Sequence, residues 1–229
     1  MKSPSLRWRD RIGAFLENRL FISTELLVVV ILQTLQAVRF ISAALIYLFV
    51  IGWLSLWLRK SGWRQLGLSR PTSWLRTIGI GALVGLVYQA VSIWLVVPLL
   101  HQLTNEPLDL SQVTTVHNNV SLLILWLTVS WTIGAFGEEM VYRGYLLNRV
   151  ADLLRHSRVS WVIGLIGSSV LFGIGHSYQG ITGILETFVF GCVMAGLYLT
   201  GRRNLWLLVI AHGVYDTAAL VLIFLGLYP

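Results

Sequence analysis

Long apolar stretches dominate this chain and leave it few ways to fold. Of its 229 residues, 56% are hydrophobic and only 12% are charged, whereas soluble domains carry about 25% charged residues. Most stretches are close to the roughly 20 residues that a helix needs to cross a bilayer. We therefore expect an all-α, polytopic membrane helical bundle of about seven transmembrane helices. The expected spans are Leu20–Val38, Ile41–Leu58, Thr77–Leu100, Val120–Glu138 with a continuation to Asn148, Val159–His176, Ile181–Thr200 and Leu205–Leu227.

Basic residues gather in alternate loops between these spans. They lie in segments Arg59–Arg76, Arg149–Arg158 and Arg202–Arg203, whereas the loops between these segments contain no Lys or Arg. The positive-inside rule then places the N-terminus in the cytoplasm and the C-terminus outside, with only Arg39 on the opposite side. The same rule accounts for the net charge of +7, so we expect no nucleic-acid partner.

The chain divides into a short leading segment and one membrane domain. Residues 1–19 are basic and mildly amphipathic, with Arg7, Arg9 and Arg11 beside Trp8 and Phe15. Such a segment is expected to lie on the membrane surface. Residues 20–229 are expected to form a single transmembrane domain.

Small residues mark close helix packing. Gly81 and Gly85 form a GxxxG pattern, for which we favour packing within the chain over a dimer seam. The single Cys192 excludes an intrachain disulfide and a CxxC zinc site, and we expect it to pack in the core. The oligomeric state does not follow from these features.

Charged side chains interrupt one apolar span. Glu138 and Glu139 are followed by Arg143, although a charge at the centre of a bilayer helix costs about 2.5–3.5 kcal/mol. On a helix, Glu139 and Arg143 share a face and can pair. Glu138 points about 100° away and is left to face a cavity.

Two further polar pairs follow at the same i, i+4 spacing. Phe172 with His176 and His212 with Asp216 lie in later spans. Each pair alone suits packing or a simple hydrogen bond. If the three helix faces converge, they supply the carboxylates and imidazoles that activate water and stabilise an oxyanion. Other polar residues have no assigned role or partner: His101, His117, His156, Glu25 and Glu186.

These three motifs, in this order on successive membrane helices, resemble the CPBP family. This family comprises the CAAX-protease and bacteriocin-processing (Abi) membrane proteins, including the type II CAAX prenyl endopeptidases. Segment Trp63–Leu68, followed by Pro71, is similar to a pre-core segment of bacterial members. The resembling core, about residues 120–227, is nearly half of the chain, and the first three spans match only in general character.

The resemblance implies a role for each matched position. Glu138 would be the base that activates water, and His176 would share that water. His212 and Asp216 would stabilise the tetrahedral oxyanion. The remaining motif residues would organise the site: Glu139, Arg143 and Phe172.

Asp216 departs from the eukaryotic pattern, which has Asn at this position, while bacterial members vary between Asn and Asp. An amide can donate a hydrogen bond but an ionised carboxylate cannot. Asp216 must therefore be protonated, orient His212 or serve another purpose. The departure weakens the inference of a CAAX substrate more than it weakens the resemblance to the family.

The same residues admit a second chemical interpretation. Glu138, His176, His212 and Asp216 could also ligate zinc, although no HExxH motif is present. We expect no metal, with zinc as the alternative.

The fifth span must start below the membrane, tilt, or break near Gly173 and Gly175 to bring His176 to a polar cavity at mid-depth.

The resemblance implies an intramembrane endopeptidase in the bacterial cytoplasmic membrane. Its partners would be the lipid bilayer and a membrane-associated peptide or protein substrate, prenylated or not. The alternative is a non-catalytic CPBP-like scaffold, chaperone or bacteriocin-immunity protein. A small proton-coupled transporter is a further rival, but no inverted symmetry of broken helices supports it.

Overall fold

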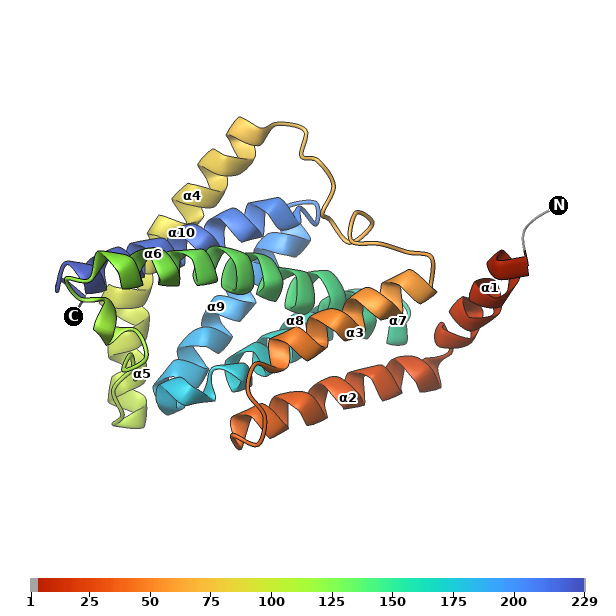
Figure 1. Cartoon of the computed structure of the whole chain (residues 1–229), viewed down its shortest axis with the longest axis horizontal. Coiled ribbons are helices and arrows are strands. Elements are labelled where there is room, and N and C mark those ends of the chain that lie inside the picture. Colours follow the sequence, from red (N-terminus) through yellow and green to blue (C-terminus); the bar gives the residue numbers. More distant parts are fainter. Residues whose placement is uncertain (1–3, 229) are drawn as a thin grey trace.

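Helices form the regular secondary structure of residues 4–228, the part of the chain that this computed structural model describes. Six helical runs in this part are long and apolar enough to cross a membrane, and a shorter apolar helix accompanies them. The protein is therefore a multi-pass integral membrane protein built as a helical bundle, which confirms the predicted fold class (Figure 1). The elements are α1 (Pro4–Leu16), α2 (Arg19–Ala37), α3 (Ala44–Leu58), α4 (Trp74–Val91), η1 (Ser92–Val96), α5 (Val97–Thr104), η2 (Thr114–Val116), α6 (Val120–Val129), η3 (Ser130–Leu146), α7 (Leu147–Leu153), α8 (Arg158–Gly175), η4 (Ser177–Gln179), α9 (Gly180–Thr200) and α10 (Leu205–Phe224).

The predicted basic leading segment corresponds to helix α1, which projects from the end of the bundle (Figure 1). Residues 1–3 lie outside the described part, as does the side chain of Arg7. Trp8 and Phe15 are exposed, as expected of a helix that lies on a membrane surface. Asn18 ends the segment by capping α2, since its side chain accepts a hydrogen bond from the backbone N–H of Leu20 at 3.1 Å.

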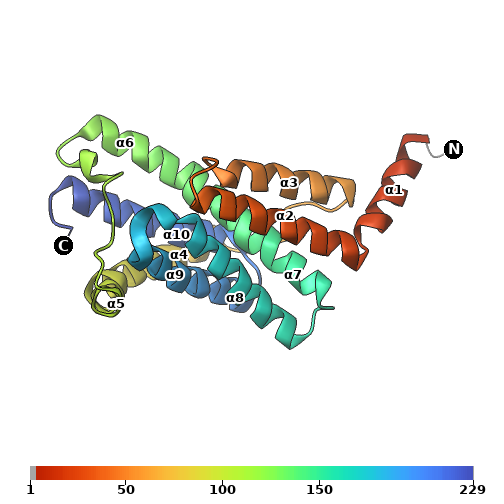
Figure 2. The same ribbon diagram turned by 90° about the horizontal axis from the view of Figure 1, so that it is seen from below.

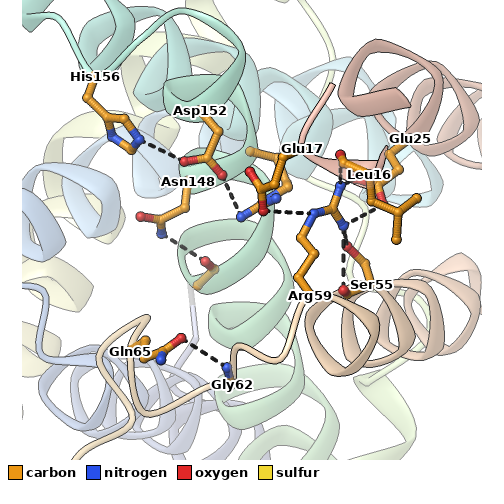
Figure 3. A network of polar contacts seen from close by, with 12 residues as sticks. Leu16, Glu17, Glu25, Ser55, Arg59, Gly62, Gln65, Asn148, Asp152 and His156 are labelled. Atoms are coloured by element: carbon orange, nitrogen blue, oxygen red, sulfur yellow. Dashed lines mark hydrogen bonds and ion pairs between the residues drawn. The ribbon is translucent and has the colours of Figure 1, made fainter. Parts of the chain in front are cut away.

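A buried arginine ties α1 to the α2–α3 hairpin (Figure 3). The Arg59 guanidinium binds both carboxylate oxygens of Glu25, each at 2.9 Å, and donates to the carbonyl of Leu16 at 2.7 Å. Ser55 accepts a further hydrogen bond, and Glu17 lies 3.4 Å from the guanidinium Nε. Glu25, for which no partner was predicted, is therefore held in an ion pair.

The longest helical run crosses the centre of the bundle. Elements α6, η3 and α7 form one continuous run from Val120 to Leu153, which confirms the predicted extension beyond Glu138. It passes between the α2–α3 hairpin on one side and helices α8 to α10 on the other (Figure 2). Its middle part, η3, is π-helical. Wide turns of this kind, with i→i+5 hydrogen bonds, are frequent at functional sites.

Helices α4 and α10 make the closest helix contact through the predicted glycine pair. A Cβ atom at Gly85 would lie 2.3 Å from the carbonyl oxygen of Ala211, and one at Gly81 would lie 2.8 Å from Ile210. Only the absence of side chains lets the two backbones approach this closely. The GxxxG pattern therefore packs within the chain, as predicted.

Helix α8 ends at the residue that precedes a predicted site histidine. Gly175 is its last residue, and His176 leaves helical geometry with φ −102° and ψ 21°. The short turn η4 then leads into α9. A Cβ at Gly173 would lie 2.6 Å from the Ile184 carbonyl oxygen of α9, so the hairpin closes tightly. Helix α8 thus continues without a break through Gly173 and ends at Gly175, so His176 lies directly after its last residue.

Candidate active site

The predicted ion pair of η3 forms within the core. Glu139 and Arg143 are both fully buried, and Arg143 Nη1 donates to Glu139 Oε1 at 3.0 Å. Nη2 of the same guanidinium donates to the carbonyl of Gly191 on α9 at 3.2 Å. The pair is confirmed, and it also joins η3 to α9. Breaking it would leave a charge without a partner in the interior.

Glu139 also orients an imidazole from another helix. His212 Nδ1 on α10 lies 2.8 Å from the same oxygen, Glu139 Oε1. An ionised carboxylate only accepts hydrogen bonds, so Nδ1 of His212 must carry the proton. This contact fixes the ring and leaves Nε2 as the free nitrogen. Nε2 lies 3.8 Å from Glu138 Oε2 and 3.7 Å from Asp216 Oδ2.

A backbone carbonyl holds the second imidazole, that of His176, in place. His176 Nδ1 lies 2.9 Å from the carbonyl oxygen of Phe172. A carbonyl cannot donate, so Nδ1 carries the proton, and in the neutral ring Nε2 is an acceptor. Nε2 lies 4.0 Å from Glu138 Oε1. Both histidines therefore present Nε2 to the same carboxylate.

Glu138 lies between the two imidazoles without a direct hydrogen-bond partner among the described residues. Separations of 3.8 and 4.0 Å exceed hydrogen-bond length, and such gaps suit a bridging water. Its side chain is 17% exposed and lines a cavity of about 250 Å³ together with His176, His212 and Asp216. The predicted convergence of the three helix faces on one polar space is confirmed.

Phe172 packs among the charged and aromatic groups of the site. Its ring meets the His176 and His212 rings edge-on, with centroids 4.8 and 6.2 Å apart. The Arg143 guanidinium lies over the same ring at 4.5 Å. An aromatic face in this position favours the cation and restricts the rotation of both imidazoles. The structure therefore places Phe172 where a site-organising residue is expected.

Asp216 enters the cavity but does not position His212 through a direct hydrogen bond. Its Oδ2 lies 3.7 Å from His212 Nε2, which is beyond hydrogen-bond length. Glu139 already holds the opposite nitrogen of that ring. The direct contact that orients the His212 ring is therefore made by Glu139 and not by Asp216.

Residues outside the predicted set support the site. Gln33 on α2, buried at 1% exposure, donates hydrogen bonds to the Tyr142 hydroxyl on η3 and to the Leu171 carbonyl on α8 at 3.2 Å. It joins η3, which carries Glu138, to α8, which ends next to His176. The sequence signal for Gln33 was its position as a polar residue within an apolar span, but nothing in the sequence indicated which residues it would contact.

Glu186 on α9 contributes a further carboxylate to the cavity wall. Its Oε1 accepts hydrogen bonds from Ser92 Oγ at 2.8 Å and the Tyr215 hydroxyl at 3.0 Å. The Tyr215 ring stacks on Phe190 at 4.6 Å, and Phe190 meets the His212 ring at 4.8 Å. Glu186 thus has the partners that the sequence did not reveal, and it braces the aromatic wall beside His212.

The remaining histidines are engaged elsewhere. His101 lies within α5 rather than in a loop, because that helix extends to Thr104, and its Nδ1 contacts the Glu106 carbonyl at 2.9 Å. His156 pairs with Asp152 at 2.8 Å. His117 contacts the side-chain amide of Asn118 at 2.9 Å. None of the three lines the cavity.

Among residues 4–228, no three His, Cys, Asp or Glu side chains are spaced to hold a metal ion. Zinc ligands lie about 2.0–2.3 Å from the ion and surround it tetrahedrally. In the cluster around Glu138, the nearest nitrogen and oxygen atoms of neighbouring side chains stand 3.7 to 4.0 Å from one another. The absence of a metal stays a prediction, and the mechanism below assigns no chemical step to one.

Comparison with known protein families identifies one match. Residues 120–218 match the family described as type II CAAX prenyl endopeptidase Rce1-like. The matched region contains η3, α8 and α9 and the part of α10 that carries His212 and Asp216. No curated protein and no solved structure matches the chain.

Proposed function

We propose that this protein, whose residues 120–218 form an Rce1-like type II CAAX prenyl endopeptidase domain, is an intramembrane endopeptidase that cleaves with a water activated by Glu138 and His176. Membership in that family implies a membrane peptidase. The expected substrate is a membrane-associated peptide or protein, because Glu138 and His212 lie on membrane-spanning helices and His176 directly follows one.

One observation carries the proposal. A carboxylate without a direct partner lies between two imidazole Nε2 atoms at 3.8 and 4.0 Å, while each Nδ1 is held by a different acceptor. A purely structural carboxylate would be expected to close these gaps and form ion pairs. Gaps of this length, open to a cavity, support the binding of a reactive water.

The geometry suggests how the bond is hydrolysed. A water between Glu138 and His176 donates one hydrogen to the carboxylate and one to the neutral Nε2. Its oxygen attacks the scissile carbonyl while Glu138 takes a proton. The tetrahedral intermediate then collapses, the C–N bond breaks, and Glu138 returns the proton to the leaving amine. The products are a carboxylate and an amine.

The oxyanion would lie on the opposite side, beside His212. In its imidazolium form His212 donates through Nε2, because Nδ1 is already bonded to Glu139. Glu139 and Arg143 keep this ring in place through the shared oxygen Oε1. Asp216, 3.7 Å from Nε2, favours a cation at His212 by its own negative charge when ionised.

Membrane orientation completes the proposal. We place the N-terminus and the arginine-rich loops in the cytoplasm because of the distribution of Lys and Arg between successive loops. In this orientation Glu138 lies 15 residues before Leu153, the cytoplasmic end of its helical run. A substrate would reach it from within the membrane.

The test compares purified full-length protein with Glu138→Gln on a library of membrane peptides, read by mass spectrometry. Glutamine keeps the size and polarity of the side chain but removes the base, so cleavage should fall at least about 10²-fold. Glu25→Gln is the matched control, because that carboxylate is paired away from the cavity. Equal turnover in wild type and Glu138→Gln would contradict the proposal and favour a non-catalytic scaffold or chaperone.

A further inference from the structure

A basic hollow of about 560 Å³ lies at one end of the bundle, where α4 and α10 begin. The α3–α4 connection and the α9–α10 turn form its walls, and we call it the arginine pocket. Neither aspartate nor glutamate lines it. Its five arginines are Arg64, Arg70, Arg76, Arg202 and Arg203.

These arginines differ from those of the protein interior. Within the described part of the chain, Arg64, Arg70, Arg76 and Arg202 form no ion pair and donate no side-chain hydrogen bond, and all four are exposed. The fifth guanidinium lies over the Trp161 ring at 4.1 Å. The positive-inside rule accounts for basic loops but not for the convergence of two of them on one hollow. The pocket therefore carries positive charge that the protein leaves uncompensated.

Two helix N-termini open into the same hollow. Helix α4 has 18 residues and is capped by Ser73, and α10 has 20 residues and is capped by Asn204. Both capping residues line the pocket. A helix N-terminus carries about half a positive charge and unsatisfied N–H groups, which favour a bound anion. The helix ends thus add to the field of the arginines.

One wall of the pocket is fixed by hydrogen bonds rather than left as a mobile loop. The carbonyl of Gly67 accepts from Leu205 N–H at 3.1 Å, and the carbonyl of Leu66 accepts from the Tyr198 hydroxyl at 2.7 Å. Gly67 has φ +109°, and a Cβ there would lie 1.7 Å from the Arg203 carbonyl oxygen. Only glycine permits this contact. Segment Trp63–Leu68, which the catalytic mechanism does not use, therefore has a positional role here.

Apolar groups place the pocket at the level of lipid headgroups. Trp74 and Trp206 lie at the first turns of α4 and α10, with ring centroids 5.5 Å apart. Tryptophan is enriched at membrane–water interfaces. Leu75 is 85% exposed beside them, and Ile80 contributes an apolar side chain to the pocket itself. The pocket thus combines a cationic part with an edge that faces acyl chains.

We propose that the arginine pocket binds the phosphate headgroup of an anionic phospholipid. Arginine forks match phosphate oxygens in geometry and charge, and basic pockets between membrane helices recognise such headgroups. The proposal does not depend on the peptidase activity, because the pocket lies at the start of α10, roughly 10 Å along the helix axis from His212.

The test uses full-length protein in detergent and native mass spectrometry to count bound lipids. Phosphatidylglycerol is compared with zwitterionic phosphatidylcholine of the same chain length, and inorganic phosphate is added as a competitor. Arg76→Gln/Arg202→Gln removes two pocket charges, and Arg155→Gln/Arg158→Gln removes two charges from the α7–α8 turn outside the pocket. Arg76→Lys/Arg202→Lys keeps the charge. Thermal unfolding is measured for every variant.

Wild type should retain phosphatidylglycerol over phosphatidylcholine, and the pocket variant should lose affinity for it roughly 30-fold, the effect of two basic residues near anionic headgroups. The α7–α8 control should keep most of the binding. The lysine variant should bind more tightly than the glutamine variant but less tightly than wild type, because lysine keeps the charge and loses the fork geometry. Equal losses in the pocket and control variants would show a diffuse charge effect and overturn the proposal. Displacement of phosphatidylglycerol by millimolar inorganic phosphate would overturn the lipid assignment in favour of a free-phosphate site. If the glutamine variant does not fold, the proposal is tested by the wild-type preference for phosphatidylglycerol over phosphatidylcholine and by the binding of the lysine variant. Equal binding of the two lipids by wild type would overturn it.

Discussion

Two clusters of this protein each contain a buried arginine paired with a glutamate, and they differ in whether a further carboxylate stays without a direct partner. Around Arg59, the guanidinium contacts both oxygens of Glu25 and also donates to a backbone carbonyl and a hydroxyl (Figure 3). Around Arg143, the guanidinium contacts one oxygen of Glu139 at 3.0 Å, and the neighbouring Glu138 stays 3.8 to 4.0 Å from its partners. An ion pair in direct contact holds helices together, whereas a carboxylate without a direct partner beside a cavity is available for chemistry. The predictions below test this distinction.

The largest effect is expected from Arg143→Ala. The substitution leaves the Glu139 carboxylate buried without its cation, at a cost of about 3–5 kcal/mol, and removes the group that holds Glu139 beside His212. Both the thermal unfolding midpoint and the cleavage rate should fall. Arg59→Ala is the matched control, since it should lower stability without lowering the cleavage rate of the folded fraction. Normal folding and activity in Arg143→Ala would show that the pair is incidental.

His176→Ala should separate chemistry from stability. It removes the Nε2 atom that shares the proposed water, so kcat/KM should fall about 10²-fold or more. Its unfolding midpoint should stay close to that of wild type, because among the described residues its side chain makes one hydrogen bond, to the Phe172 carbonyl near the end of α8. Activity on a library-derived peptide measures this, with His156→Ala as an unaffected control. A His176→Ala variant that cleaves at the wild-type rate would remove His176 from the mechanism.

Glu25→Gln should give the opposite pattern. Loss of the charge-assisted contacts with Arg59 should cost about 1.5–3 kcal/mol, measured as a lower unfolding midpoint in detergent. The cleavage rate of the folded protein should not change, because Glu25 does not line the cavity. A selective loss of activity with unchanged stability would mean that the cluster around Glu138 is not the only one with a function.

The smallest effect is expected from metal removal. Treatment with a strong chelator should leave the cleavage rate unchanged, since the mechanism assigns no step to a metal. Elemental analysis of the purified protein gives an independent readout. Stoichiometric zinc that requires His176 and His212, with activity lost on its removal and restored on its return, would establish a metallopeptidase instead.

The sequence alone determined the features that depend on local composition and spacing. Apolar runs of bilayer length predicted the multi-pass bundle, because lipid selects for such stretches one helix at a time. The i, i+4 spacing predicted the Glu139–Arg143 contact, since both residues lie on one helix. The glycines at 81 and 85 predicted a close helix contact for the same local reason.

Only the tertiary structure decided which groups meet across helices. The sequence predicted that His176 and Asp216 would lie near the site, but not that α8 ends before His176 or that Glu139 rather than Asp216 fixes the ring of His212. The partners of Gln33 and Glu186 likewise come from residues far along the chain.

The physical reason is the range of the interactions. Hydropathy and helix periodicity act over a few residues, so a single sequence displays them directly. The π-helical geometry of η3, the end of α8 and the convergence of two arginine-rich loops at the starts of α4 and α10 depend on how separate helices pack. Their energies come from contacts between distant segments, which the spacing of residues in one segment does not encode.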